Sequence, residues 1–314
     1  MKKALLIFIC TILMFASLVS CSEYKPSDDK LLIVVTAFPH YDFTRQIVKD
    51  TENVEIRMLI SPGREVHTYD PSVEDMASIS ECDILICTGG HSDIWLDNIL
   101  ESCDNKDMTV VSFMEICSDG SHEEHEHGHE HTKHDNHDHY DEHVWTSPVF
   151  ASQITSHICE VLCKKDPGNA EIYKKNRDGF ISELSNLDKE FSDIAASASR
   201  KEIIVADRFP FQHLVTEYSI EYSAAYPGCS SSTEPSALTV ANLSQKVKND
   251  DIPVVFTIEF SNRSIAQNVV EATDTKILTL HSCHNVSAED FEKGITYIDL
   301  MKQNAQNLRK ALCE

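Results

Sequence analysis

Apolar residues occur along this chain in short continuous runs, separated by longer segments in which they recur at three- and four-residue steps. Runs such as 31–35 (LLIVV) are typical of strands buried in a parallel sheet, and the spaced segments are typical of amphipathic helices. The predicted strands cover residues 31–35, 54–60, 83–87, 109–113, 203–206, 220–224, 254–258 and 276–280. The predicted helices cover 41–50, a segment starting near 71–72, 93–102, 147–164, 211–218, 239–248, 265–273 and 289–312. This alternation predicts an α/β protein with mostly parallel sheets flanked by helices.

One helical pattern is much longer than the others. Between Pro167 and about Arg200 the apolar spacing is sustained, and Gly179 is its one weak point. At a rise of 1.5 Å per residue, such a helix is roughly 50 Å long. We therefore expect two α/β lobes, residues 31–165 and 201–314, with residues 166–200 as the linker helix between them.

The first twenty residues have the pattern of a signal peptide. Lys2 and Lys3 precede an uncharged run that is long enough for a signal-peptide core and short for a stable membrane span. The run ends in a small residue followed by Cys21, which resembles the lipobox of bacterial lipoproteins. We predict cleavage before Cys21 and attachment to a lipid bilayer through its acylated cysteine, with residues 21–30 as a tether. An ordinary secretory peptide and an uncleaved anchor are the alternatives.

The chain is strongly acidic, with 51 acidic and 27 basic residues and a formal net charge of −24. Such a charge disfavours a nucleic-acid partner and is compatible with cation capture. Outside the leader, no apolar stretch is long enough to cross a bilayer. Eleven cysteines are present, and nine remain once Cys10 and Cys21 are set aside. An odd number cannot all pair within one chain, so we expect mostly reduced, buried thiols.

Residues 119–142 interrupt the α/β pattern, because they contain eight histidines, many acidic residues and almost nothing apolar. Such a segment cannot build a core and is predicted to be a mobile surface loop. Its histidines are His122, His125, His127, His129, His131, His134, His137 and His139. We expect the loop to collect metal weakly for a main site. A solvated acidic tether that binds metal only incidentally is the alternative.

Isolated histidines recur where the predicted strands end. In parallel α/β layers, ligands bind beyond the carboxyl ends of the strands. The histidines in or near such positions are His40, His67, His91, His143, His213, His281 and His284. Three or four neutral imidazoles make a tetrahedral site that suits zinc. The sequence therefore predicts a transition-metal site built from several of these residues.

Three segments carry a resemblance to a known family. They are 41–44 (YDFT), 64–72 (REVHTYDPS) and 141–148 (DEHVWTSP). Together they resemble the solute-binding lipoproteins of zinc and manganese ABC importers, and the similarity covers nearly all of residues 31–314. The histidine-rich loop before the third segment is typical of the zinc-selective branch. The resemblance implies two α/β lobes joined by a rigid helix and a metal site in the cleft between them. It further implies a monomeric receptor, not an enzyme, that works outside the cytoplasm with a membrane permease.

The resemblance also implies a ligand set. His67 and His143 match two family ligands, and His281 aligns with the fourth, usually an aspartate. The third departs from the pattern, because Arg208 stands where the family has histidine or glutamate, and arginine cannot bind a cation. Water, Asp207 or His213 is then expected to replace it, and Arg208 could pair with Glu259. Imidazole in place of carboxylate favours Zn²⁺ over Mn²⁺.

Other functions remain open from the sequence. A manganese or iron receptor of the same family is the nearest alternative, followed by a surface adhesin that uses the same fold. A zinc hydrolase is less favoured, because the sequence contains no H-E-x-x-H motif and no obvious general base beside the histidines.

Overall fold

The structure is a computed structural model that describes residues 30–118, 141–229, 234–271 and 273–314. The predicted leader, Cys21, nearly all of the tether and the eight histidines of the 119–142 segment lie outside the described residues. Leu31–Glu314 forms one unit by its internal contacts. Among the described helices, none combines the length and the apolarity that crossing a bilayer requires.

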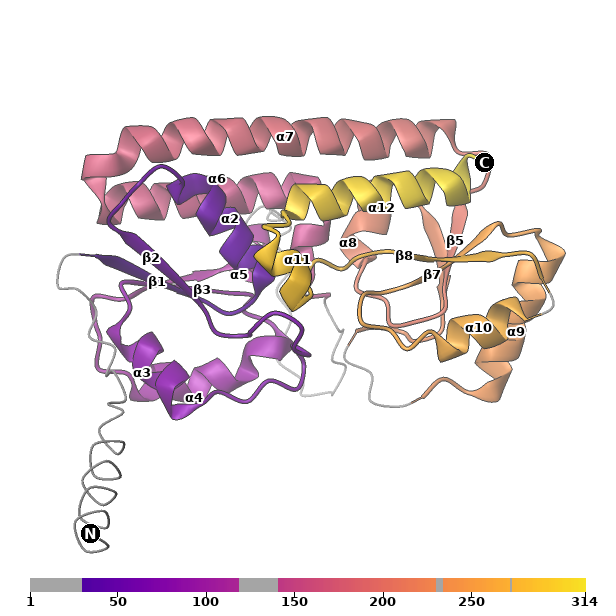
Figure 1. The fold of residues 1–314 in the computed structure, drawn as a ribbon, viewed down its shortest axis with the longest axis horizontal. Coiled ribbons are helices and arrows are strands. Elements are labelled where there is room, and N and C mark those ends of the chain that lie inside the picture. The colour runs from indigo at the N-terminus through magenta and orange to yellow at the C-terminus, as the bar shows by residue number, and fades with distance from the viewer. Residues whose placement is uncertain (1–29, 119–140, 230–233, 272) are drawn as a thin grey trace, which may run out of the picture. The chain divides into compact units, whose positions relative to one another are not determined.

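The described residues of this unit form two four-stranded sheets, and every strand pair in both is parallel (Figure 1). The N-terminal sheet has the order β2-β1-β3-β4 and comprises β1 (Leu31–Val35), β2 (Val54–Met58), β3 (Ile84–Cys87) and β4 (Thr109–Ser112). The C-terminal sheet has the order β6-β5-β7-β8 and comprises β5 (Glu202–Val205), β6 (Glu221–Ala224), β7 (Val254–Thr257) and β8 (Lys276–Thr279). The predicted fold class is confirmed.

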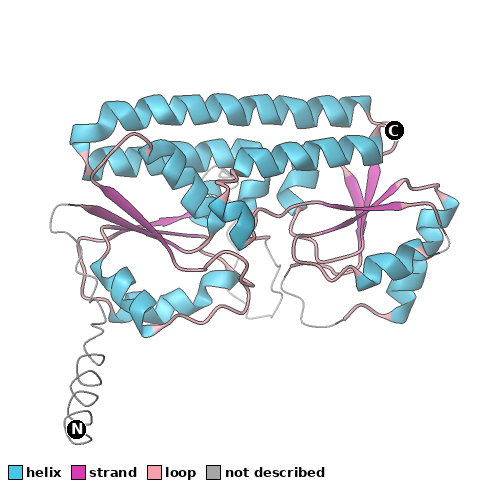
Figure 2. Cartoon of the chain, in the orientation of Figure 1, coloured by secondary structure: helices cyan, strands magenta, loops and turns pink. Residues whose placement is uncertain are grey.

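Helices flank both sheets (Figure 2). Those of the N-terminal half are α2 (Phe38–Val48), α3 (Val73–Glu81), α4 (Ile94–Ser102), α5 (Phe113–Ser118) and α6 (Pro148–Lys165). Successive residues of β1 face opposite sides of the sheet. Ile33 and Val35 join the core that contains Phe43 of α2, whereas Leu32 and Val34 join a second core with residues of α3 and α4. Burial on both faces explains why the strands are continuous apolar runs.

The C-terminal sheet is flanked by α8 (Gln212–Glu217), α9 (Ala237–Asn249), α10 (Ser264–Val270) and α12 (Tyr297–Leu312). The short helix α11 (Ala288–Glu292) instead packs against α2, where the ring of Phe291 lies 5.1 Å from that of Tyr41. The expected single closing helix over 289–312 is wrong, because the chain turns between α11 and α12. Gly294 has φ +75°, a conformation that favours glycine. Thr296 then caps α12, and its side chain accepts a hydrogen bond from the Asp299 backbone N–H.

The long predicted helix exists as α7 (Ala170–Ser197), preceded by a short 3₁₀ turn at Pro167–Asn169. Near its start, Asn176 donates hydrogen bonds to two carbonyls at the end of α2. Near its end, Asp188 accepts a hydrogen bond from Tyr218, and Phe191 stacks on the Tyr218 ring. The same helix therefore packs on residues of both halves, as the resemblance implied. The boundaries expected for the lobes stay predictions.

Candidate metal centre

Three histidines from three separate segments meet in the described structure. His67 lies in the loop after β2, His143 directly precedes a 3₁₀ turn before α6, and His284 follows β8. One ring nitrogen from each lies within 4.8 Å of the other two. Two of the segments follow carboxyl ends of parallel strands, where α/β proteins bind ligands. The sheets thus bring together imidazoles that are up to 217 residues apart in the chain.

Each ring nitrogen of His143 has a defined neighbour. Nδ1 lies 2.6 Å from Oδ1 of Asp141, which also accepts a hydrogen bond from the His143 backbone N–H. Nε2 lies 3.2 Å from Nδ1 of His284. Burial opposes a charged ring, but the carboxylate of Asp141 outweighs it and holds the pKa of His143 well above its usual range. A carboxylate on Nδ1 leaves Nε2 to face a metal.

His67 lies beside Glu142, but its Nδ1 has no hydrogen-bond partner among the described residues. Its Nδ1 lies 3.6 Å from Oε1 of Glu142, whose other oxygen accepts a hydrogen bond from the backbone N–H of Ser92. Its Nε2 lies 2.9 Å from Sγ of Cys229. Burial lowers the pKa of His67, but the Cys229 sulfur and the Glu142 carboxylate outweigh this effect, so the pKa is raised overall. Conversely, the rings of His143 and His67 lower the pKa of the Cys229 thiol despite its burial.

His284 is buried, like His143. Its Nε2 is buried and has no hydrogen-bond partner among the described residues. The ring centroid lies 5.0 Å from that of Trp145, and the indole N–H of Trp145 donates to the carbonyl of Ser282. Burial and the neighbouring His143 and His67 rings hold the pKa of His284 well below its usual range. His284 is therefore a neutral imidazole, the form that ligates metals.

The structure does not bring His281 into this cluster. Its Nδ1 accepts a hydrogen bond from the backbone N–H of Cys283, and the same nitrogen lies 3.7 Å from Oε2 of Glu259. Cys283 has φ +60°, a left-handed conformation that turns the chain between the two histidines. His284, which the sequence placed only near the strand end, stands with His67 and His143 instead.

The other candidates are not members of the three-histidine cluster. Nε2 of His213 lies 2.6 Å from the Asp141 carbonyl oxygen, and the Asp207 carboxylate accepts a hydrogen bond from the Arg208 backbone N–H. His40 is fully buried with its ring 4.2 Å from that of Phe113, whereas His91 is exposed in a 3₁₀ turn.

Arg208 has a different partner from the expected one. Its guanidinium lies 3.3 Å from a carboxylate oxygen of Glu65, a residue of the N-terminal half. Glu259 instead accepts a hydrogen bond from the backbone N–H of Ser282. The predicted pair of Arg208 with Glu259 is therefore wrong. The Glu259 carboxylate therefore binds the backbone of the turn after β8 and not Arg208.

A small cavity of about 30 Å³ adjoins the cluster, enough for one water molecule or ion. His67, His284, Arg208 and Cys229 are among its lining residues. Sequence reasoning missed Cys229 as a site residue. Two signals point to it: it follows a strand, as the histidines do, and the count of mature cysteines is odd. All nine cysteines from Cys82 to Cys313 are free thiols, as expected.

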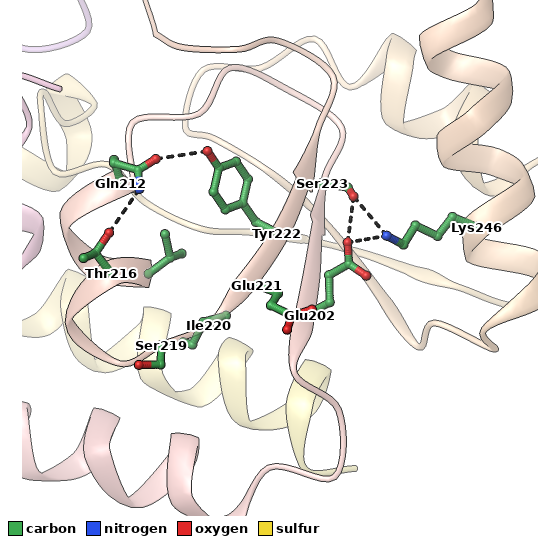
Figure 3. Close-up of a pocket in the computed structure, with 10 residues that line it drawn as sticks. Glu202, Gln212, Thr216, Ser219, Ile220, Glu221, Tyr222, Ser223 and Lys246 are labelled. Carbon is green, nitrogen blue, oxygen red and sulfur yellow. Dashed lines mark hydrogen bonds and ion pairs between the residues drawn. The ribbon is translucent and has the colours of Figure 1, made fainter. Parts of the chain in front are cut away.

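A second hollow of about 600 Å³ lies on the C-terminal half, beside β6 (Figure 3). In it, Lys246 pairs with Glu202, and Gln212 links Tyr222 to Thr216 through hydrogen bonds. The described residues that line it include neither histidine nor cysteine. None of its lining residues belongs to the three-histidine cluster.

Known proteins resemble this chain over nearly its full length. The zinc-binding lipoprotein AdcA of Streptococcus pneumoniae is 32% identical over 99% of this chain, and the match covers 61% of that protein. The high-affinity zinc uptake system protein ZnuA of Bacillus subtilis is 32% identical, over 90% of this chain and 88% of that protein. The crystal structure of the Zn(II)-bound ZnuA-like domain of S. pneumoniae AdcA superposes with a TM-score of 0.73 at 26% identity, covering 91% of this chain and all of that one.

The streptococcal relative is thus considerably longer than the region it shares with this chain, which spans less than two thirds of it. The family model described as zinc-uptake complex component A, periplasmic, matches residues 33–311. That match includes both sheets, α7 and the three clustered histidines. This chain therefore belongs to the zinc-uptake complex component A family.

Proposed function

We propose that this protein is an extracytoplasmic receptor that captures Zn²⁺ with His67, His143 and His284 and delivers it to an ABC-type importer. The observation that carries the proposal is the convergence of three imidazole nitrogens within 4.8 Å. The Asp141 carboxylate lies at hydrogen-bond distance from Nδ1 of His143, an arrangement that orients metal-binding histidines and raises their basicity. The Glu142 carboxylate lies 3.6 Å from Nδ1 of His67 and acts on that ring through its charge.

The donor atoms favour zinc over the alternatives. Neutral imidazole suits Zn²⁺, whereas Mn²⁺ prefers carboxylate and water oxygens. The carboxylates of Asp141 and Glu142 contact ring nitrogens, so in this proposal they support ligands and do not bind the ion. Metal analysis of protein purified without added metal tests the assignment: we expect zinc near one equivalent, and manganese or iron in its place would overturn it.

The position of the ligands suits a receptor. His67 and His143 belong to the N-terminal half and His284 to the C-terminal half, so a bound ion links the two. Ligand binding can shift a protein between conformations only through different contacts in each state. Such a link gives a permease a way to distinguish the loaded receptor from the empty one. The family consists of receptors, and we assign no catalytic reaction to this site.

Calorimetry with purified protein tests the ligands directly. We expect one tight zinc site in the wild type and its loss in the His67→Ala/His143→Ala double variant. The His281→Ala variant is the control, because His281 lies close in sequence but outside the cluster. Unaltered tight binding in the double variant would reject these histidines as ligands.

The membrane attachment is a separate part of the proposal. We propose that Cys21 is acylated and holds the receptor at the outer side of a bacterial membrane. The support is the signal-peptide pattern of residues 1–21 and the lipoprotein named among the relatives. Metabolic labelling with a fatty acid should mark the wild type and leave Cys21→Ser unlabelled. Equal labelling of both would refute the attachment site.

A further inference from the structure

We infer that the sulfur of Cys229 is the fourth zinc donor, which completes a site of three histidines and one cysteine. The inference rests on the proposed function, since it concerns the same ion. In this site Cys229 takes the place of the third family ligand, because the arginine at that position, Arg208, cannot bind a cation.

Three observations place Cys229 at the site. Its Sγ lies 2.9 Å from Nε2 of His67, the ring nitrogen opposite the one beside Glu142. Cys229 and His284 line the same cavity, which has room for one small occupant. Independently of the thiol, one ring nitrogen from each of His67, His143 and His284 lies within 4.8 Å of the other two, and the nitrogen of His284 that faces His143 is Nδ1. A set of imidazoles this close together can hold a metal ion.

The backbone explains how a residue far along the chain arrives there. After β6, the backbone N–H of Tyr226 donates to the carbonyl of Asp207, and that of Phe209 donates to the carbonyl of Gly228. These two bonds hold the segment before Cys229 against the segment that carries Arg208. The guanidinium of Arg208 meanwhile pairs with Glu65. The loop after β6 thus supplies a donor beside a segment whose own side chain cannot bind a cation.

Two donor distances can be compared with those of a tetrahedral zinc ion. Zinc–nitrogen bonds of about 2.0–2.1 Å place two tetrahedral nitrogen donors about 3.3 Å apart. His143 Nε2 and His284 Nδ1 are 3.2 Å apart. A zinc–sulfur bond of about 2.3 Å places sulfur about 3.5 Å from a nitrogen donor. The contact between Cys229 and His67 has to widen by less than one ångström when the ion enters. Sγ of Cys229 is not among the donor atoms that all lie within 4.8 Å of one another, so its loop also has to shift to bring the sulfur to the ion.

The chemistry of the fourth donor affects which metal ion the site prefers. When zinc binds, the zinc–sulfur bond forms with the thiolate and the zinc–nitrogen bonds form with neutral rings, so the protons held by Cys229 and by the clustered histidines pass to solvent. Three neutral imidazoles and one thiolate leave a net charge of +1 on the site. A thiolate is a soft donor, so it favours Zn²⁺ over Mn²⁺ more strongly than a water or carboxylate oxygen does.

X-ray absorption of the zinc-loaded full-length protein tests the inference. We expect one sulfur at about 2.3 Å with the remaining donors nitrogen, and only nitrogen and oxygen in Cys229→Ser. The Co²⁺-substituted wild type should show a sulfur-to-metal charge-transfer band that Cys229→Ser lacks. Cys103→Ser is the matched control, because Cys103 is also a partly exposed free thiol but lies outside the cavity lining.

The zinc affinity of Cys229→Ser should fall by at least about tenfold, because even the loss of an outer-shell partner costs about 10- to 100-fold. One tight zinc with no sulfur signal in the wild type would overturn the inference and leave the proposed function intact. A sulfur signal that persists in Cys229→Ser would also overturn it, since another thiol would be the donor. A wild type that binds no zinc would defeat both proposals.

Discussion

Oδ1 of Asp141 lies 2.6 Å from Nδ1 of His143, two residues further along the chain. This contact fixes the orientation of a ring whose other nitrogen faces His284. Asp141→Asn should therefore lower zinc affinity by about 10- to 100-fold while leaving the stoichiometry at one. Titration against a chromogenic chelator measures the change. Asp207→Asn is the control, because the Asp207 carboxylate accepts a hydrogen bond from Arg208 and lies outside the cluster. Equal losses in both variants would contradict a specific role for Asp141.

The two histidines after β8 provide a matched pair of substitutions. His284→Ala removes a ring of the cluster and should lower zinc affinity at least about tenfold, by the reasoning applied to Cys229. His281→Ala should change it little, because its Nδ1 is engaged with the backbone of its own turn. Calorimetry measures the zinc affinity of both variants and shows which histidine is the ligand. The reverse order of effects would restore His281 as the ligand and remove His284.

Arg208 and Glu65 should change the zinc affinity only through their charges. Their pair is partly exposed and joins the two halves of the protein at 3.3 Å. Arg208→Ala removes a positive charge near a cation site and should raise zinc affinity by less than about tenfold, whereas Glu65→Gln should lower it. Both effects should shrink as salt is added, and competition titrations at two ionic strengths measure this. Loss of binding in Arg208→Ala would show instead that the arginine positions the loop.

His40 should make stability depend on pH. Burial lowers its pKa to about 3, against about 6.5 in the unfolded chain. Between these values the unfolded state binds more protons, so stability is fully present above pH 6.5 and is lost as the pH falls toward 3. The loss from this residue is about 2 kcal/mol by about pH 5.

The His40→Asn variant isolates that contribution. Nδ1 of His40 accepts a hydrogen bond from the backbone N–H of Ala37, and an asparagine oxygen can take its place. Urea unfolding of the metal-free proteins should show a free-energy gap between wild type and variant that narrows by about 2 kcal/mol from about pH 7 to about pH 5. A constant gap would mean that His40 is protonated equally in both states.

Deletion of residues 120–140 should separate the accessory loop from the main site. We expect the tight zinc to remain, because the clustered histidines lie outside the deletion. Weakly bound zinc should disappear, and zinc uptake by cells at scarce metal should slow. Cells that take up scarce zinc equally well with and without the loop would mean that its histidines bind metal only incidentally.

The sequence alone predicted the layers of this protein well. Each buried strand is a continuous apolar run, because both of its faces are covered, and α7 keeps its apolar spacing over its full length. His67 and His143 stood out because they occur in specific motifs beside strand ends and loops. The closing helix was drawn too long, because apolar spacing continues across Gly294 and does not register the turn there.

Only the tertiary structure decided which side chains face the cavity. His281 and His284 are equivalent in the sequence pattern, and the left-handed turn at Cys283 separates their directions. Cys229 and Arg208 find their partners, His67 and Glu65, 162 and 143 residues away. Periodicity reports which face of an element is buried, because that preference is local. Contacts between loops depend on the path of the folded backbone, which no local pattern contains, so the donor set could be read only once both sheets were in place.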